Sequence, residues 1–207
     1  YKTDLAGNGS VFRKISGAND EYIYRNITDN NGNVYLTGYF YSDKLTIDST
    51  AIDTSKIKLL NVQQGTSDLI LLKYNSQGIF QWGRATGTSN DEKILNIDYS
   101  NNKIIITGTF DCKIGFYNFT LINSGGSDAF ISECDTTGHF INAQQASGKS
   151  TDVGETCKYS SNGRNFIAVG DFISDTLAIG TSQFINSFSG KRDAYIAKYG
   201  CFDSVQF

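Results

Sequence analysis

Three stretches decide the fold of this chain: Asn33-Val-Tyr-Leu-Thr-Gly-Tyr-Phe40, Lys103-Ile-Ile-Ile-Thr-Gly-Thr-Phe110 and Asn165-Phe-Ile-Ala-Val-Gly-Asp-Phe172. Each is an apolar run that ends in Gly-x-Phe, and the glycines stand at positions 38, 108 and 170, so the offsets are 70 and 62. A chain that repeats itself at such a period folds as copies of one small unit that stack on one another. The repeat therefore constrains function more strongly than any single residue does.

Two further landmarks repeat in the same order. One contains aspartates at 68, 128 and 193, in Ser67-Asp-Leu-Ile70, Ser127-Asp-Ala-Phe130 and Arg192-Asp-Ala-Tyr195. The other is Gly9-Ser-Val-Phe12, Gly78-Ile-Phe80 and Gly138-His-Phe140, each running to a turn at Gly17, Gly87 or Gly148. We expect one β-repeat domain over 1–207, with repeats at about 9–78, 79–138 and 139–203.

The apolar runs are short, rich in Ile, Val, Tyr and Phe, and bounded by Gly, Asn, Asp and Ser, which is typical of strands. The sequence predicts an all-β fold with four antiparallel strands in a unit. The expected strands are 21–28, 33–40, 68–75 and 79–85, then 93–99, 103–110, 128–134 and 139–145, then 155–160, 165–172 and 193–199. Apolar patches between the hairpins could form an extra short strand or cover an edge.

The third unit lacks a fourth strand, whereas a matching strand, Val11-Phe-Arg-Lys-Ile15, stands unassigned at the front of the chain. Proteins usually cap an unpaired edge strand, because its free main-chain groups invite pairing with other chains. We expect the N-terminal strand to complete the last unit, either within one molecule or in a neighbouring copy.

Composition excludes several partner classes. Hydrophobic residues make up 39 % and charged residues 19 % of the 207 residues, as in soluble globular proteins, and the net charge is −3. No Lys/Arg block is present, which argues against nucleic acid as a partner. No apolar run approaches the roughly 18 residues of a membrane helix, which argues against membrane insertion. The chain begins with Tyr1, which we interpret as the start of a processed or excised piece.

Four cysteines at 112, 134, 157 and 201 fit no zinc-binding spacing. Their even number in a β-rich chain is compatible with two disulfides in an oxidising compartment, with the connectivity left open. The alternative is that they are free thiols that pack as small hydrophobic side chains.

The residues do not favour catalysis, a metal site or a cofactor. His139 is the single histidine, so a Ser-His-Asp arrangement would depend on it alone. The acidic pairs Asp20-Glu21 and Asp91-Glu92 recur with the repeat and are typical of solvated turns. The recurring Asp68, Asp128 and Asp193 are expected to cap backbone N–H groups rather than to hold a cation.

Two features of the sequence relate to sugars: a pair of tyrosines and a set of glycosylation motifs. Tyr39 and Tyr41 flank Phe40 and therefore point away from it, where they could stack on a sugar ring. Candidate N-glycosylation sites are the sequons at Asn8, Asn26 and Asn118. Candidate O-glycosylation sites are the Asp-Ser/Thr-apolar motifs at Ser49, Thr136, Thr176 and Ser204. Asn26 is the least favoured because it lies inside a predicted strand.

The motifs Asp29-Asn-Asn-Gly-Asn-Val-Tyr-Leu-Thr-Gly38, Gly65-Thr-Ser-Asp-Leu-Ile-Leu-Leu-Lys-Tyr74 and Gly78-Ile-Phe-Gln-Trp82 resemble the bacterial β-propeller repeat family that is named for seven-bladed propellers. The resemblance extends over about 9–203. It departs at Glu133-Cys134, which replace Lys-Tyr, and in units two and three, which lack the Trp. The resemblance implies three propeller-like blades of four strands and, because members are commonly secreted or surface-displayed, an extracellular location.

Closed propellers usually contain four to eight blades, so three predict a partial arc, a repeating assembly or a section of a longer chain. We expect a non-enzymatic secreted or cell-surface structural protein, a building block of a larger array or extracellular filament. Its partners would be further copies or neighbouring repeats of a longer chain. The alternative is a glycan-binding adhesion module.

Overall fold

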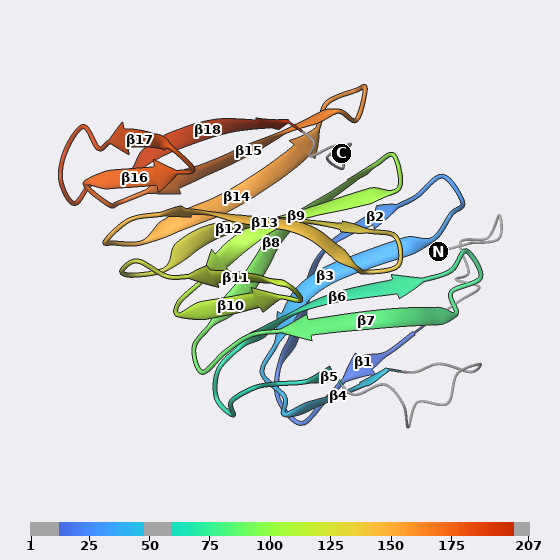
Figure 1. The fold of residues 1–207 in the computed structure, drawn as a ribbon. Coiled ribbons are helices and arrows are strands. Elements are labelled where there is room, and N and C mark those ends of the chain that lie inside the picture. The colour runs from blue at the N-terminus through green and yellow to red at the C-terminus, as the bar shows by residue number, and fades with distance from the viewer. Residues whose placement is uncertain (1–12, 48–58, 201–207) are drawn as a thin grey trace, which may run out of the picture.

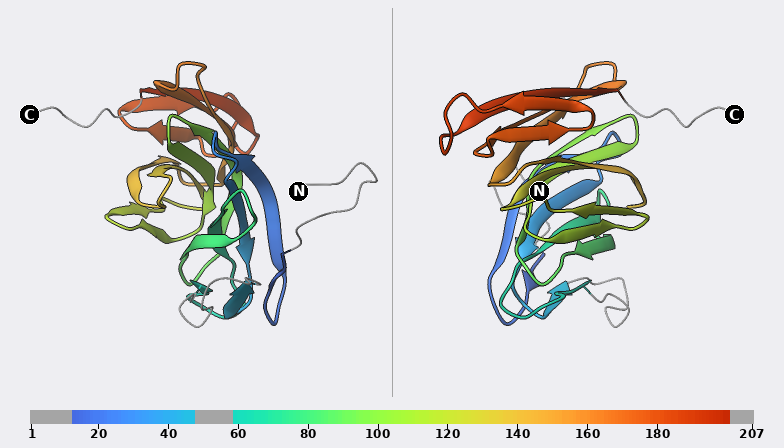
Figure 2. Two further views of the ribbon diagram at one scale, coloured as in Figure 1. Left: turned by 90° about the vertical axis from the view of Figure 1, so that its right-hand side faces the viewer. Right: turned by 60° about the vertical axis from the view of Figure 1, so that its left-hand side comes forward.

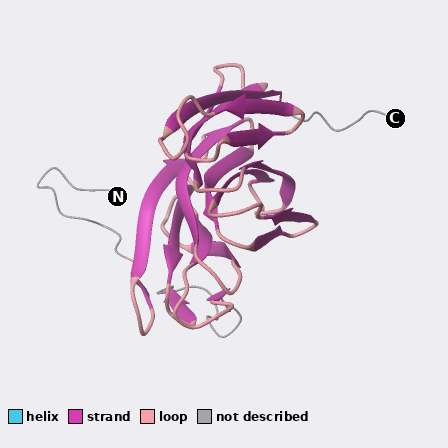
Figure 3. Ribbon diagram, turned by 90° about the vertical axis from the view of Figure 1, so that its left-hand side faces the viewer, coloured by secondary structure: helices cyan, strands magenta, loops and turns pink. Residues whose placement is uncertain are grey.

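The computed structural model describes residues 13–47 and 59–200, which form antiparallel strands joined by turns, without a helix (Figure 3). Three sheets share one strand order, in which each strand pairs with the next along the unit. Unit 1 contains β2 (Glu21–Thr28), β3 (Val34–Phe40), β6 (Asp68–Tyr74) and β7 (Phe80–Thr86). Unit 2 contains β8 (Glu92–Ser100), β9 (Lys103–Phe110), β12 (Asp128–Asp135) and β13 (Phe140–Ser147). Unit 3 contains β14 (Asp152–Tyr159), β15 (Asn165–Phe172) and β18 (Asp193–Gly200). The predicted strands are confirmed to within a few residues.

The apolar patches between the second and third strands of each unit form short hairpins. These are β4 (Lys44–Ile47) with β5 (Leu59–Leu60), β10 (Lys113–Phe116) with β11 (Phe119–Ile122), and β16 (Thr176–Ile179) with β17 (Ser182–Ile185). The hairpin of unit 3 reaches back to unit 2, because β16 pairs with the end of β13 and extends that sheet to six strands. Likewise, β4 pairs with β1 (Ile15–Ser16).

The units stack in chain order, so that unit 3 and the β4–β5 hairpin lie at opposite ends of the molecule (Figures 1 and 2). The first strands of units 2 and 3 lie on the sheet before them: β8 contacts β2, β3 and β6, and β14 contacts β8, β9 and β12. Buried clusters of aliphatic and aromatic side chains fill the layers between the sheets.

The Gly-x-Phe signature has a steric cause. In every unit the first strand has a bulge opposite this glycine, at Ile23/Arg25, Ile94/Asn96 and Gly154/Thr156. A Cβ atom would lie 1.7 Å from the Tyr22 carbonyl oxygen at Gly38, and 1.8 and 1.9 Å from the corresponding oxygens at Gly108 and Gly170. Only glycine allows so close an approach of two backbones, so the repeated residue marks the repeated bulge.

The hairpin turns use the predicted Asn, Asp and Gly chemistry. Asp29 Oδ1 accepts hydrogen bonds from the backbone N–H groups of Asn31 and Asn33, both at 2.9 Å, and Gly32 has φ of 75°. Asp29 Oδ2 accepts from Asn33 Nδ2 and from the Tyr35 hydroxyl. The Asp29 carboxylate therefore organises a turn, a role that the Asx residues commonly have.

The expectation that the N-terminal strand completes the last unit within one molecule is wrong for the described residues. Ile15 pairs with Ile47 and Ser16 with Thr46, at the end of the stack remote from β18 (Figure 1). Val11 and Phe12 lie outside the described residues. Unit 3 has three strands, and its β18 pairs with β15 on one side. Within the part of the chain that is described, no helix is long and apolar enough to span a membrane.

Candidate interaction surfaces

Units 1 and 2 each present one pair of apolar side chains to the unit that follows. In unit 1 these are Tyr35 and Leu71, which are fully buried in one cluster with Ile94 of β8. In unit 2 the same positions are Ile105 and Ile131, which are buried against unit 3. The register supports this equivalence, because Thr37 pairs with Leu71 as Thr107 pairs with Ile131. Contact between units is therefore a repeated feature with fixed positions.

A backbone hydrogen bond and buried carboxyl groups accompany each contact. The N–H of Glu92 donates to the Ser67 carbonyl oxygen at 2.9 Å, and the N–H of Asp152 donates to that of Ser127 at 2.7 Å. As predicted, the recurring aspartates cap backbone N–H groups: Asp68 accepts from Val62 at 2.9 Å, Asp128 from Ser124 at 2.7 Å and Asp193 from Ser187 at 2.8 Å. Among the described residues, no group of three or more His, Cys, Asp or Glu side chains is arranged to hold a metal ion.

The carboxyl groups between the units are hard to ionise. Burial raises the pKa of Asp68 to about 6 and that of Asp128 to about 6. Burial, together with the nearby charges of Asp68 and Asp111, raises the pKa of Glu92 to about 8, against hydrogen bonds from Thr88 that lower it. Removing water from a carboxylate disfavours its charged form, so these carboxyl groups lose their protons at a higher pH than exposed ones do.

The far face of unit 3 exposes the side chains that the other units bury. Ile167 and Ile196 occupy the positions of Ile105 and Ile131, yet their exposed fractions are 42 % and 69 %, against 0 % and 5 %. Asp193 occupies the position of Asp68, and hydrogen bonds from Ser187 lower its pKa. No described element covers this face, which we name the open face.

The opposite end of the stack exposes the complementary position. Ile23 of β2 corresponds to Ile94 of β8, and its exposed fraction is 42 % against 0 %. Arg13, just before β1, donates from Nε to the carbonyl oxygen of Gly78 at 2.8 Å. Arg84 of β7 donates from Nε to the equivalent Gly138 at 3.1 Å. The chain around β1 therefore resembles the end of a fourth strand that belongs to a preceding unit.

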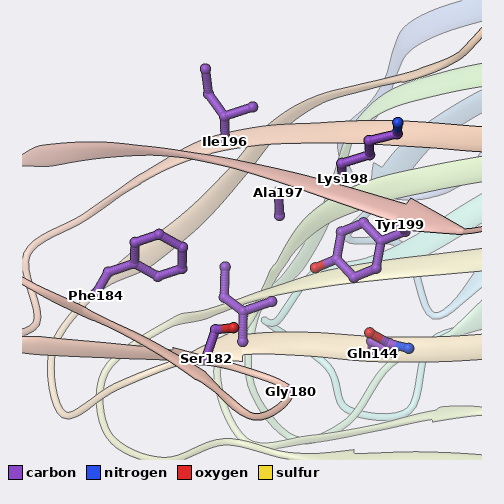
Figure 4. Close-up of a pocket in the computed structure, with 9 residues that line it drawn as sticks. Gln144, Gly180, Ser182, Phe184, Ile196, Ala197, Lys198 and Tyr199 are labelled. Carbon is purple, nitrogen blue, oxygen red and sulfur yellow. The ribbon is translucent and has the colours of Figure 1, made fainter.

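A cavity of about 270 Å³ lies between the free edge of β18 and the β16–β17 hairpin (Figure 4). Ala197 and Tyr199 line it from β18, Phe184 and Ser182 line it from β17, and Gln144 closes it from β13. We name this cavity the slot. Its walls combine apolar rings with the polar atoms of Gln144, Ser182 and the unpaired strand edge.

The cysteines do not form the expected pair of disulfides. Cys112 is an exposed free thiol, and Cys134 and Cys157 are buried free thiols in two different clusters. Burial raises the pKa of both buried thiols, which keeps them protonated and unreactive. The two behave as small hydrophobic side chains. Cys201 lies outside the described residues.

The tyrosines considered for sugar stacking belong to a larger cluster. Tyr39 packs at its centre, with its ring centroid 5.1 Å from that of Tyr22 and 5.3 Å from that of Tyr24. Tyr41 contacts Tyr39 edge-on at 6.0 Å, and the Lys93 ammonium lies over the Tyr39 ring. Tyr39 is 8 % exposed, so it supports the cluster, while Tyr22 and Tyr24 are exposed at 41 % and 43 %. Both residues were missed from the sequence, although the predicted hairpin of the first two strands could have found Tyr22, which pairs directly with Tyr39.

The remaining predicted positions lie apart from one another. Asn26 is exposed on β2, and Asn118 is exposed in the turn between β10 and β11. Thr136 and Thr176 are partly buried, in the β12–β13 turn and in β16. Asn8, Ser49 and Ser204 lie outside the described residues. His139 is exposed next to the ring of Tyr117, at 5.3 Å between centroids.

Comparison with known proteins adds one distant similarity. No protein-family model matches the chain. The chain is 27 % identical over 135 residues to an "Uncharacterized WD repeat-containing protein L264" of Acanthamoeba polyphaga mimivirus, over 61 % of this chain and 10 % of that protein. The chain thus spans about a tenth of the length of this relative. WD repeats form four-stranded blades, so the similarity and the repeated sheets together support a β-propeller-like repeat fold.

Proposed function

We propose that the chain is a non-enzymatic structural repeat protein whose units are propeller-like blades and whose two ends join copies into a larger array or filament. The observation that carries the proposal is the pairing of exposed ends. Ile23 at one end, and Ile167 and Ile196 at the other, are counterparts of side chains that are buried wherever one unit follows another. A second copy would bury all three in the way that Ile94 is buried against Tyr35 and Leu71.

Such a contact joins two different surfaces, so it is heterologous. Heterologous contacts produce rings when the rotation closes and open filaments when it does not. The resemblance to the bacterial seven-bladed repeat family supports blades as the unit, and its commonly surface-displayed members support a secreted or cell-surface location. The activity of the much longer viral relative is not transferred to this chain.

Light scattering as a function of protein concentration tests this proposal. The mass of the wild-type particle should rise with concentration, and Ile167→Asp should remove the rise because a charge would be buried without a partner. Ile122→Asp is the matched control, since Ile122 is also an exposed isoleucine, at 65 %, but lies on the β10–β11 hairpin. A wild-type chain that stays monomeric, or an Ile167→Asp variant that assembles like wild type, would reject the proposal.

A glycan-binding module is the second candidate, favoured by the tyrosine cluster. Tyr22 and Tyr24 expose their rings side by side at 6.4 Å between centroids, and the Tyr24 hydroxyl lies 3.1 Å from that of Tyr39. Aromatic rings with polar tips suit a sugar, which has both apolar faces and hydroxyl groups. Binding on a glycan array that is lost in Tyr22→Ala and Tyr24→Ala would support this candidate. An array without hits would remove it.

A further inference from the structure

We infer that the slot beside β18 is a binding site for an extended strand that carries a phenylalanine, and that its occupant is the segment 9–16 of a second copy of this chain. The inference rests on the proposed function and adds which segment makes the contact. Its basis is that units 1 and 2 fill the same place with their own fourth strands.

In unit 1 the fourth strand, β7, runs over residues that correspond to the walls of the slot. A Cβ atom on Gly83 of β7 would lie 2.9 Å from Leu72 of β6 and 3.0 Å from Leu59 of β5. Leu59 pairs with Leu45 in unit 1, and Phe184 pairs with Leu177 in unit 3, so Leu59 and Phe184 are counterparts. Leu72 is the counterpart of Ala197. The fourth strand therefore lies between the third strand and the linking hairpin.

Unit 2 fills the equivalent place in the same way. β13 pairs with β12 along its length, and Gln145 of β13 exchanges two hydrogen bonds with the main chain of Ile122 on β11. Leu121 of β11, the counterpart of Phe184, is 7 % exposed beneath this strand. In unit 3, Phe184, Ala197 and Tyr199 are only partly buried and line the cavity instead.

The fourth strands of the complete units carry small residues opposite the counterparts of Ala197. Gly83 pairs with Leu72, and Ala143 pairs with Ser132. In unit 3 the small residue is Ala197 itself, and the rings of Phe184 and Tyr199 line the slot beside it. A cavity of about 150 Å³ already accepts a benzene ring, so the 270 Å³ of the slot suffices for a phenyl side chain.

Phe12 lies three residues before Ile15, as Ala143 lies three residues before Ala146, so a strand in this register brings Phe12 opposite Ala197. Arg13 is hydrogen-bonded to Gly78 of unit 1, and β1 pairs with β4 at the end of the stack remote from β18 (Figure 1), so we assign the occupant to a second copy. Addition of a strand to a free sheet edge supplies main-chain hydrogen bonds, and the side-chain pocket supplies selectivity.

In a second copy, the geometry of β1 suits this role. β13 pairs with β12 of its own unit over most of its length, and its last residues, Ala146 and Ser147, pair with β16 of the next unit. Ile15 and Ser16 already make the corresponding pairs with β4. The residues before them would then pair with β18 of the neighbouring copy, as the earlier part of β13 pairs with β12.

Fluorescence anisotropy of a labelled peptide with the sequence of residues 8–17 tests the inference on the full chain. We expect saturable binding, and at least tenfold weaker binding of the Phe12→Ala peptide, because a buried aromatic anchor is typically an interface hot spot. Ala197→Phe should block the slot with a side chain of the same kind, and Tyr199→Ala should weaken binding by removing a ring that lines the slot. Circular dichroism confirms that each variant is folded.

Ile122→Asp, which is remote from the slot, should bind the peptide like wild type. Absence of peptide binding, or equal binding of the wild-type and Phe12→Ala peptides, would overturn the inference. A further outcome is that the peptide fails to bind although the wild-type chain assembles and Ile167→Asp prevents that assembly. In that case the proposed function is kept and the inference about the slot is rejected. If the peptide binds but the chain stays monomeric at every concentration, a second copy does not occupy the slot, and both the inference and the proposed function are overturned.

Discussion

The interface between units 2 and 3 and the open face of unit 3 are built from the same positions of the same repeat. Ile105 is fully buried, whereas its counterpart Ile167 is 42 % exposed. The pKa of Asp128 is raised by burial, whereas that of its counterpart Asp193 is lowered by hydrogen bonds from Ser187. The difference is that β14 lies on one face and no described element lies on the other. The isoleucines of the open face are therefore exposed because no further unit covers them, and not because unit 3 is built differently.

The largest expected effect concerns the bulge glycines, which lie inside each unit. It should be the same in unit 2, whose face is covered, and in unit 3, whose face is open. Gly108→Ala and Gly170→Ala both place a Cβ atom within 2 Å of a backbone oxygen, of Lys93 and Val153. We expect each to lower the free energy of unfolding by about 3 kcal/mol or more, or to prevent folding. Gly115→Ala is the control, since nothing lies within 4 Å of its added Cβ. Chemical denaturation measures all three, and a mild effect at Gly108 would contradict the bulge as the cause of the repeat.

The comparison itself is tested by truncating the two equivalent isoleucines. Ile105→Ala should lower the free energy of unfolding by roughly 2–5 kcal/mol, because it opens a cavity in a filled contact. Ile167→Ala should change it by about 0.5 kcal/mol or less at concentrations where the chain is monomeric, because the side chain is already exposed. Equal losses at the two positions, measured by urea denaturation, would show that the open face is not an unfilled contact.

The carboxyl groups of the filled contacts should make stability depend on pH. The folded-state pKa of Glu92 is about 8 and its ordinary value is 4.5. Between these values the folded state keeps a proton that the unfolded state releases, so stability falls as the pH rises through this window. Each pKa unit corresponds to about 1.4 kcal/mol, so Glu92→Gln should be more stable than wild type at pH 8 and flatten the slope between pH 5 and 8. Thermal unfolding across this range measures it.

Glu155→Gln is the control for that experiment, since Glu155 is exposed on β14. Its pH profile should follow that of wild type. Asp193 should act in the opposite direction to Asp68, because its lowered pKa contributes stability that is lost as the pH falls through the folded-state value. A wild-type slope unchanged by Glu92→Gln would contradict burial of that carboxyl group between units.

The smallest expected effect is the difference in reactivity among the thiols. Cys112 is exposed and should be alkylated in the native protein, whereas Cys134 and Cys157 should react only after unfolding, because both are buried and protonated. Mass spectrometry of alkylated peptides, without prior reduction, measures this. Rapid native labelling of Cys134 or Cys157 would show that the contacts between units open readily.

Local signals in the sequence predicted the strands well. The predicted strands 21–28, 103–110 and 165–172 coincide with β2, β9 and β15, because apolar composition and Asn/Gly turns are encoded in neighbouring residues. The exposure of Ile167 and Ile196 could also have been inferred, by aligning them with Ile105 and Ile131. Tyr22 could have been found from its place opposite Tyr39 in the predicted hairpin, whereas Tyr24 could not, because it is the bulged residue and has no partner in the register.

The position of the N-terminal strand was predicted wrongly within one molecule for a physical reason. The repeat indicates that a fourth strand is displaced from unit 3 to the front of the chain, but it does not indicate that this strand also pairs with a hairpin. The pairing of Ile15 with Ile47 holds the strand at unit 1. The cysteine spacing likewise carries no information on which buried cluster each thiol joins, and Cys134 and Cys157 join different ones.

The central claim is that the open end of unit 3 is completed by another copy of the chain. Hydrogen–deuterium exchange of β18 at increasing protein concentration tests it most directly, with β12 as the internal reference because it is already paired on both sides. We predict that exchange at β18 slows as concentration rises, while exchange at β12 stays constant. Exchange at β18 that is the same at every concentration would contradict the claim.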